Sequence, residues 1–433
     1  MKISALQQFR SIAIGGHTSC PAQAFILAIA LVLTMLAPAA HAQSFSVIHT
    51  FAGSDGIKPY AGVSIHGGNL FGTTAFGGGN NGTVWELSHS GSSWLINPIS
   101  YLFGTGNQPK ARAVFGPDAH LYTIAEIGGA EGNGSVFSLT PPISICRTAQ
   151  CFWRETDVHS FAGSPSDGQY PGSGDLIWDQ QGNIYGVTGS GGLTNAGIVY
   201  ELTPSGNSYT EKILYNFLGL ADGAGPNGVV IDSKGNLFGT AYSGGLQDCP
   251  QQQDCGVVFE LTNVPGVGWQ ETVLYAFTGG NDGANPIGGV ILDSLGNLYG
   301  TTRAGGMGGA GTLFELSPSG NSWTYNVLYS FSGIYGCGSW ASLTLDAAGN
   351  LYGTTDCAGL DQRGNVFKLT KTQNGWTYTS LYDFTGGADG GYPVGNVTID
   401  SDGTLYSTAS GGGSSQGACA AYGGCGTVWM IKP

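Results

Sequence analysis

The chain has 433 residues, of which only 10% are charged, and its formal net charge is −14. The Lys and Arg residues form no cluster that could neutralise phosphates, so the composition excludes a nucleic-acid partner. The 76 glycines would suit a disordered or collagen-like chain, but 11% aromatic residues and recurring β-branched runs favour a packed all-β protein.

The first 42 residues have the pattern of a signal peptide. Lys2 and Arg10 precede an apolar stretch at 24–36, and Ala40-His41-Ala42 then forms a small-x-small cleavage site. The stretch is shorter than the ~20 residues that span a bilayer, which favours cleavage over an uncleaved anchor. We expect a mature chain from Gln43 that has no transmembrane segment and is secreted, periplasmic or on the cell surface.

Three landmarks each occur seven times in the mature chain. The first is an aromatic strand end followed by glycine, at Phe51, Phe103, Phe161, Phe217, Phe277, Phe331 and Phe384. The second is a strand like Leu-Tyr-Gly-Thr-Thr, at Leu70, Leu121, Ile184, Leu237, Leu298, Leu351 and Leu405. The third is a strand like Gly-Thr-Val-Phe-Glu-Leu, at Gly82, Gly134, Gly197, Gly256, Gly311, Gly364 and Gly426.

This repeat predicts a β-propeller. Successive phenylalanines are 52 to 60 residues apart, which is room for four short strands, and no helical periodicity is visible. In the fifth repeat we expect strands at 289–293, 297–302, 312–316 and 323–331. Residues 43–433 are therefore predicted to form one domain, a seven-bladed β-propeller of four-stranded antiparallel blades, which we number in chain order.

A tight turn joins the first two strands of most blades. In blade five it is Asp293-Ser294-Leu295-Gly296-Asn297, in which the aspartate accepts backbone hydrogen bonds and the glycine allows positive φ. The same turn recurs at Asp179, Asp232, Asp346 and Asp400. Because these aspartates follow the repeat, we interpret them as structural.

The two ends of the mature chain predict how the ring closes. Residues 45–51 match the fourth strand of a repeat, whereas residues 428–431 match a third strand and nothing follows them but Lys432 and Pro433. The N-terminal strand should therefore complete blade seven. Such closure removes free sheet edges, which would otherwise invite aggregation.

Eight cysteines remain in the mature chain, and an even number in an exported protein indicates disulfides. Three pairs are close in sequence, which leaves Cys337 and Cys357 as the fourth. The predicted pairs are Cys146 with Cys151, Cys249 with Cys255, Cys337 with Cys357, and Cys419 with Cys425.

The motifs Gly-Asn-Leu-Tyr-Gly-Thr-Thr at 296–302, Gly-Thr-Leu-Phe-Glu-Leu at 311–316 and Leu-Tyr-Ser-Phe at 328–331 resemble the Gloeobacter and Verrucomicrobia tandem repeat. The similarity extends over the mature chain and is weakest in blade two, where residues 117–120 replace the usual turn. The resemblance implies the repeat architecture and no particular activity. Many proteins of this kind carry C-terminal anchoring or sorting segments, so an end at Pro433 favours release.

Candidate catalytic residues are few. The mature chain has five histidines, of which His66, near the first turn, and His120, in the irregular blade two, are the candidates; the alternative is that all five are isolated structural residues. Glu126 and Glu131 are the acidic pair that departs from the repeat, and a carboxylate pair suits glycoside hydrolysis. Recurrent glutamates before leucine look like strand residues instead.

The connections between blades repeat an Asp-Gly motif, at Asp55, Asp167, Asp222, Asp282 and Asp389. Several carboxylates on one face could hold Ca²⁺, which takes six to eight oxygens. No known calcium-loop spacing is present, so we favour turn capping and expect no cofactor or metal.

Aromatic residues outside the repeat pattern gather in the same connections: Tyr60, Tyr170, Tyr335, Trp340 and Tyr392. They suit carbohydrate or protein contact, although packing between blades also uses aromatics. The leading hypothesis is a monomeric, non-enzymatic exported recognition or scaffold protein that binds glycan, peptide or an envelope partner through this loop-rich face. The alternative is an extracellular polysaccharide lyase or hydrolase with a site at the central channel or in blade two.

Overall fold

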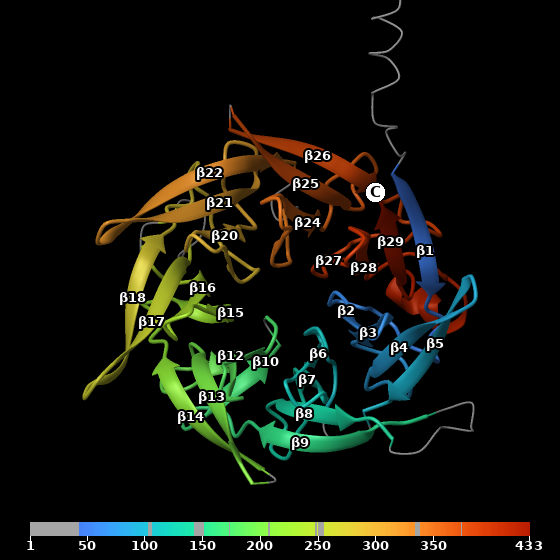
Figure 1. The fold of residues 1–433 in the computed structure, drawn as a ribbon, viewed down its shortest axis with the longest axis horizontal. Coiled ribbons are helices and arrows are strands. Elements are labelled where there is room, and N and C mark those ends of the chain that lie inside the picture. The colour runs from blue at the N-terminus through green and yellow to red at the C-terminus, as the bar shows by residue number, and fades with distance from the viewer. Residues whose placement is uncertain are drawn as a thin grey trace, which may run out of the picture. The chain divides into compact units, whose positions relative to one another are not determined.

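The computed structural model describes residues 43–102, 106–142, 151–172, 174–206, 208–246, 249, 255–333, 338–373 and 375–433. Within them, seven antiparallel sheets form a ring of blades (Figure 1). This confirms the predicted seven-bladed β-propeller. No helix in these ranges is long and apolar enough to cross a membrane.

In blades one to six the strands follow one another from the centre of the ring outward in chain order, whereas in blade seven the outermost strand is β1. Blade one contains β2 (Ser64–His66), β3 (Asn69–Thr74), β4 (Thr83–Ser90) and β5 (Ser93–Ser100). Blade two contains β6 (Val114–Phe115), β7 (Leu121–Ala125), β8 (Ser135–Thr140) and β9 (Arg154–Ser160). Blade three contains β10 (Gly168–Pro171) and β11 (Ile177–Trp178), which both pair with β12 (Ile184–Gly191), then β13 (Ile198–Ser205) and β14 (Ser208–Asn216). Blade four contains β15 (Ala224–Ile231), β16 (Leu237–Ser243), β17 (Val257–Val264) and β18 (Gly268–Ala276). Blade five contains β19 (Ile291–Leu292), β20 (Leu298–Thr301), β21 (Gly309–Ser319) and β22 (Ser322–Ser332). Blade six contains β23 (Thr344–Leu345), β24 (Leu351–Thr355), β25 (Asn365–Thr372) and β26 (Gly375–Asp383). Blade seven contains β27 (Thr398–Ile399), β28 (Leu405–Ala409), β29 (Thr427–Lys432) and β1 (Ser44–Thr50).

The closure of the ring agrees with the prediction. β1 pairs with β29 in antiparallel register, from Ser44 opposite Lys432 to Thr50 opposite Thr427, and a bulge lies between Val47 and His49. The first strand of the described chain is therefore the outermost strand of the last blade (Figure 1).

The glycine of the Leu-Tyr-Gly-Thr-Thr strand is required for packing within a blade. Gly300 on β20 pairs with Phe314 on β21, whose ring lies over it. A Cβ at Gly300 would lie 2.5 Å from Phe314 Cζ, which is closer than real Cβ contacts allow. Gly353 and Phe367 repeat this arrangement in blade six. The motif thus keeps glycine where the third-strand aromatic ring needs the space.

We expect Gly300→Ala to lower the free energy of unfolding by about 2 kcal/mol, because the methyl group overpacks a closed core and the Phe314 ring must move. Thermal melting monitored by circular dichroism measures this change. Thr324→Val, at an exposed position of β22, is the control and should melt like the wild type. Equal melting of Gly300→Ala and the wild type would show that the contact does not constrain the blade.

The core lies between neighbouring blades. Among the described residues, phenylalanines that follow a fourth strand pack on the third-strand aromatic of the next blade, as Phe277 does on Phe314 with ring centroids 5.3 Å apart. Phe217 on Phe259 and Phe331 on Phe367 follow the same pattern. The three landmarks of the sequence are therefore the contacts that join one blade to the next.

One blade junction contains a carboxyl group whose pKa is strongly perturbed. Glu271 on β18 lies beside Asp222, and burial together with the charge of Asp222 raises its pKa to about 7. Tyr215 donates a hydrogen bond of 3.2 Å to Asp222.

This shift makes the stability depend on pH. Between about pH 4.5 and 7 the folded protein holds a proton on Glu271 that the unfolded chain releases, so stability falls as pH rises through this range. Because the group is partly exposed, we expect Glu271→Gln to stabilise the protein by only about 1 kcal/mol at pH 8 and not at pH 4. Melting temperatures at both pH values test this. A variant with the wild-type pH profile would contradict the assignment.

The turn aspartates have the structural role that was predicted. Asp293 Oδ1 accepts hydrogen bonds from the backbone N–H groups of Leu295 and Asn297 at 2.9 and 2.8 Å. The same two bonds recur at Asp179, Asp232, Asp346 and Asp400. The Asp-Gly aspartates also cap turns, since Asp55, Asp167, Asp222, Asp282 and Asp389 each accept a backbone N–H bond.

Two predicted disulfides are present among the described residues, Cys249–Cys255 and Cys419–Cys425, with Cα atoms 5.8 and 4.8 Å apart. Cys151 and Cys357 are also disulfide-bonded. Their predicted partners, Cys146 and Cys337, lie outside the described residues.

Two details differ from the sequence prediction. A short 3-10 helix, η1 (Gly417–Tyr422), lies in the loop that Cys419–Cys425 closes. Six residues are too few to show a helical period, so the sequence gave no sign of it. The first strands are also shorter than expected, as in β19, because residues 287–289 line the centre of the ring instead of pairing.

Candidate functional site

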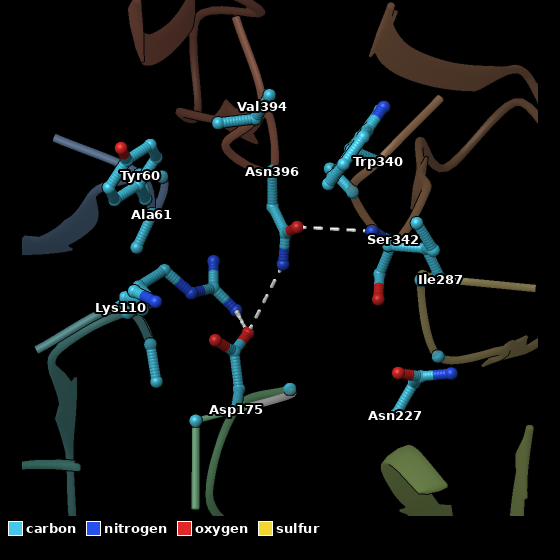
Figure 2. A pocket seen from close by; sticks show the side chains of 18 of the residues that line it. Tyr60, Ala61, Lys110, Asp175, Asn227, Ile287, Trp340, Ser342, Val394 and Asn396 are labelled. Carbon is cyan, nitrogen blue, oxygen red and sulfur yellow. Dashed lines mark hydrogen bonds and ion pairs between the residues drawn. The ribbon is translucent and has the colours of Figure 1, made fainter. Parts of the chain in front are cut away.

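A pocket of about 620 Å³ lies where the connections that enter the blades converge (Figure 2). We call it the axial pocket. Residues of all seven blades or of the connections that enter them line it: Lys58, Tyr60, Ala61, Gly62, Lys110, Ala111, Arg112, Glu126, Tyr170, Gly172, Gly174, Asp175, Asn227, Ile287, Gly288, Gly289, Trp340, Ala341, Ser342, Asp356, Tyr392, Val394, Asn396 and Ser410.

Half of these residues occupy two equivalent positions at or just before the first strand of a blade. The first position directly follows the proline of the connection, or the residue that aligns with this proline. It is occupied by Tyr60, Lys110, Asn227, Ile287, Trp340 and Val394. The position before the first core residue includes Gly62, Arg112, Asp175, Gly289, Ser342 and Asn396. Because the blades are arranged around one axis, equivalent positions meet there, and their differences in sequence give the pocket its chemistry.

A polar network crosses the pocket between four blades. Arg112 donates a hydrogen bond of 2.6 Å from Nη2 to Asp175 Oδ2, and Asn396 Nδ2 donates to the same oxygen at 3.4 Å. Asn396 Oδ1 accepts a bond of 3.1 Å from the backbone N–H of Ser342, as Figure 2 shows. Arg112 Nη1 also reaches Thr398 Oγ1 at 3.3 Å. These bonds hold the polar side chains in fixed positions before any ligand arrives.

A second ion pair lies in the pocket at blade two. Lys110 Nζ is 2.5 Å from Glu126 Oε2. Burial and the charge of Glu126 raise the pKa of Tyr60, whose hydroxyl therefore stays protonated. Glu126 is thus paired with Lys110 and lies close to Tyr60.

Two ionisable groups of the pocket have no salt-bridge partner within the described chain. Lys58 Nζ makes no hydrogen bond or ion pair there, and burial lowers its pKa. Burial raises the pKa of Asp356, although the nearby charge of Arg303 opposes this shift. Both groups are available to a ligand.

Four aromatic side chains complete the wall: Tyr60, Tyr170, Trp340 and Tyr392. Arg303 lies over the ring of Trp340, 4.5 Å from its centroid. Arg363 lies over Tyr392 and donates a hydrogen bond to its hydroxyl. The guanidinium groups hold these two rings in place.

The family comparison agrees with this architecture. Residues 249–431 match the family model described as the Gloeobacter/Verrucomicrobia repeat. Residues 249–431 are therefore similar to that repeat. The match runs from the outer half of blade four to blade seven, and the three landmarks of the sequence also occur in the earlier blades. None of the curated proteins matches the chain significantly.

The solved structures that are similar to this chain are distant. A putative oxidoreductase (glucose dehydrogenase) from Thermus thermophilus is 13% identical, with 90% of this chain and 99% of that chain covered and a TM-score of 0.44. A putative 6-phosphogluconolactonase from Bacteroides uniformis is 12% identical, with coverage of 74% and 83% and a TM-score of 0.46. A gluconolactonase from Xanthomonas campestris is 13% identical, with coverage of 72% and 82% and a TM-score of 0.40. Likeness at this level carries no argument about activity.

The structure brings together four of the five aromatic residues proposed from the sequence. Tyr60, Tyr170, Trp340 and Tyr392 all line the axial pocket of the repeat domain, and Tyr170 is the most open of them at 45% exposed. Tyr335 lies outside the described residues.

The weak catalytic candidates are not gathered in one place. Glu126 lines the pocket, whereas Glu131 is exposed and is not among the lining residues. His66 is exposed and stacks on Phe115. His120 Nδ1 lies 3.1 Å from Asp118 Oδ2, in the turn of blade two.

Sequence reasoning missed Lys58, Arg112, Asp175, Asp356 and Asn396, which give the pocket its charge and its network. A signal for three of them was present. Where the aligned repeats have Gly62 or Gly289 before the first core residue, other blades have Arg112, Asp175 and Asn396. These departures from the repeat pattern occur at positions that lie next to the axis of the ring.

Proposed function

We propose that the protein is an exported, non-enzymatic recognition protein that binds a carbohydrate in the axial pocket. One observation carries this proposal: four aromatic side chains from four connections line a single pocket together with charged and other polar side chains. Aromatic rings offer apolar area for the C–H faces of a sugar at low entropic cost. A pocket of about 620 Å³ is the size of small-molecule sites.

The free polar groups of the pocket suit sugar hydroxyls. Ser342 Oγ and the carboxyl group of Asp356 have no hydrogen-bond partner within the described chain and lie on the same wall as Trp340. The hydrogen bonds among Arg112, Asp175 and Asn396 are already formed, so these side chains need little further ordering when the ligand binds, and Arg112 Nε is a buried donor that has no partner within the described chain.

The charge of the pocket favours a sugar with an acidic group. Lys58, Lys110 and Arg112 face Glu126, Asp175 and Asp356, so the lining is balanced although the chain carries a net charge of −14. Within the described chain, Lys58 is the lining cation that has no anionic partner. A ligand carboxylate, as in a uronic acid, would form an ion pair with Lys58.

A glycan array that contains neutral and uronic-acid oligosaccharides tests the proposal. We expect saturable binding, strongest for the acidic sugars. Lys58→Gln should lose the preference for acidic over neutral sugars, while binding of neutral sugars stays unchanged. If no glycan binds in the presence or absence of calcium, a carbohydrate ligand is ruled out and protein partners must be tested.

An extracellular enzyme acting on polysaccharide is the second candidate. The observation in its favour is that Glu126, which pairs with Lys110, and Asp356, whose pKa burial raises, line the same pocket. Two carboxyl groups in unlike environments are what glycoside hydrolysis uses. Analysis of the bound oligosaccharides for cleavage products separates the two candidates.

Export is part of this proposal and rests on the signal-peptide pattern of residues 1–42 and on the disulfide bonds. N-terminal sequencing of protein recovered from outside the cytoplasm should find Gln43. An intact N-terminus at Met1 would contradict cleavage.

A further inference from the structure

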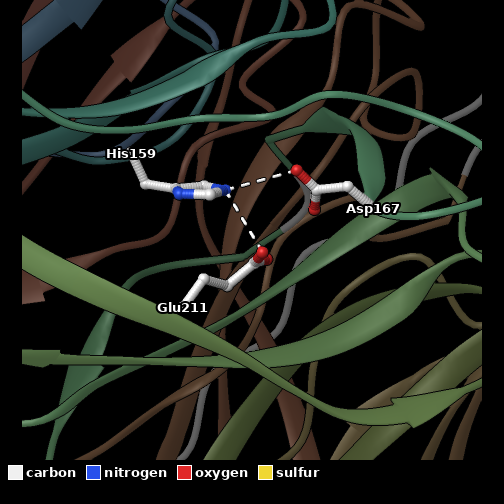
Figure 3. A group of neighbouring side chains, drawn as sticks. All are labelled: His159, Asp167 and Glu211. Atoms are coloured by element: carbon white, nitrogen blue, oxygen red, sulfur yellow. Dashed lines mark ion pairs between the residues drawn. The ribbon is translucent and has the colours of Figure 1, made fainter.

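Three side chains that can bind a metal meet at the junction between blades two and three. His159 is on β9, Asp167 lies in the connection that follows, and Glu211 is on β14 (Figure 3). One ligand atom from each lies within 4.8 Å of the other two. The side chains are only 18%, 8% and 16% exposed, so the cluster is largely shielded from water.

The distances suit ligands around a common ion better than hydrogen bonds. His159 Nε2 lies 3.4 Å from Asp167 Oδ2 and 3.5 Å from Glu211 Oε2. N–H···O bonds are about 2.7–3.2 Å long. Two ligands at about 2.1 Å from a tetrahedral ion are about 3.4 Å apart. His159 Nε2 and Glu211 Oε1 are both buried and lack a hydrogen-bond partner within the described chain.

A buried hydroxyl group accompanies the cluster. Tyr200 on β13 is fully buried, and its hydroxyl has no hydrogen-bond partner among the described residues. Burial, and after it the charges of Glu211 and Asp167, raise the pKa of this phenol, which shows that it lies near both carboxylates. The equivalent residues of the other blades have no hydroxyl group: Trp85, Phe137, Phe259, Phe314, Phe367 and Trp429.

Other junctions use these positions for ordinary hydrogen bonds. The positions equivalent to His159 include Tyr215, Tyr275, Tyr329 and Tyr382. Tyr215 donates a bond to its connection aspartate, Asp222. His49 in blade seven lies 2.9 Å from Asp55, a normal bond, and Ile96 takes the place of Glu211 there. Histidine, a second carboxylate and a buried hydroxyl are combined at one junction among those the structure describes.

We propose that His159, Asp167 and Glu211 bind one divalent transition-metal ion, for which Zn²⁺ is the best match. An imidazole nitrogen and two carboxylate oxygens are ligands that Zn²⁺ accepts, and the two carboxylates neutralise its charge. Asp167 is already oriented, because its Oδ2 accepts a bond of 2.7 Å from the backbone N–H of Ala162. The ion would connect the outer strand of blade two to that of blade three, a structural role separate from the axial pocket.

Calorimetric titration of tag-free, chelator-treated protein with Zn²⁺ tests the proposal. We expect one ion per chain and a higher melting temperature in its presence. Glu211→Gln and His159→Gln should bind about 100-fold more weakly. Tyr200→Phe, which restores the side chain of most other blades, should fold normally and weaken binding by up to about tenfold. His49→Gln and Glu271→Gln, at equivalent positions of other junctions, should bind like the wild type.

Visible absorption of the Co²⁺-loaded protein provides a second readout, since four-coordinate Co²⁺ gives intense bands that Glu211→Gln and His159→Gln should abolish. The proposal is overturned if the wild type binds no stoichiometric Zn²⁺. It is equally overturned if folded Glu211→Gln and His159→Gln variants keep wild-type affinity and the Co²⁺ bands.

Discussion

Replacing Trp340 by alanine should weaken carbohydrate binding by about 100-fold, or about 2.7 kcal/mol. Trp340 is the largest aromatic side chain of the axial pocket, and Arg303 holds its ring at 4.5 Å. Truncation removes the stacking surface for the sugar and leaves the guanidinium group without its ring. Residues of this kind, aromatic and central, contribute most of the binding energy in recognition sites. Calorimetric titration with the strongest glycan from the array measures the loss.

Two further variants separate binding from folding. Phe152→Ala removes an aromatic side chain that is 48% exposed and does not line the pocket, so its affinity should equal that of the wild type. Trp340→Phe keeps a ring and should retain most of the affinity. If Trp340→Ala is folded and binds as tightly as the wild type, the ligand does not bind against this wall.

Deleting the N-terminal strand should cause the largest loss of stability. A mature chain that begins at Phe51 lacks β1, so β29 loses its antiparallel partner from Ser44 to Thr50 and blade seven has an open edge. Phe45 also disappears, although it stacks on Tyr382 and contacts Phe384 edge to face. We expect a melting temperature at least 10 °C lower, with aggregation. Circular dichroism and light scattering measure both effects.

Graded controls show whether closure itself matters. Phe45→Ala keeps the backbone pairing and should cost only about 3 kcal/mol. A synthetic peptide of residues 43–52, added to the truncated chain, should restore part of the melting temperature because it can pair with β29. A truncated chain that melts like the wild type would show that β1 does not close the ring.

The fold could be predicted almost completely from the repeat. Each landmark corresponds to a physical requirement of the blade: Gly300 leaves space for a ring, Phe277 packs on the next blade, and Asp293 caps the first turn. Because each requirement recurs seven times, it produces a repeated residue pattern that a single sequence reveals. The shortness of β19 and the helix η1 were not visible, because each depends on a local contact that does not repeat.

The candidate site could be predicted only in part. Tyr60, Trp340 and Tyr392 were found because they are aromatic departures from the repeat in connections on one face. The contact of Arg112 with Asp175 could not be predicted, because the two residues are 63 positions apart and belong to different blades, which meet only at the axis of the ring.

The cluster at His159, at the outside of the ring, could not be predicted from the sequence either. His159 looked isolated, and Asp167 was assigned to turn capping, which is correct for one of its hydrogen bonds. Glu211 lies 44 residues after Asp167 in the sequence and is on the outer strand of blade three. Their meeting depends on how adjacent outer strands pack, which spacing along the sequence does not reveal.

A crystal structure of the protein with the strongest-binding acidic oligosaccharide tests the central claim most directly. We predict that the sugar lies in the axial pocket, with a ring face against Trp340 or Tyr392 and its carboxylate at Lys58 Nζ. A sugar bound on the outer rim of the blades, or a pocket left empty in crystals that contain the ligand elsewhere, would contradict the account.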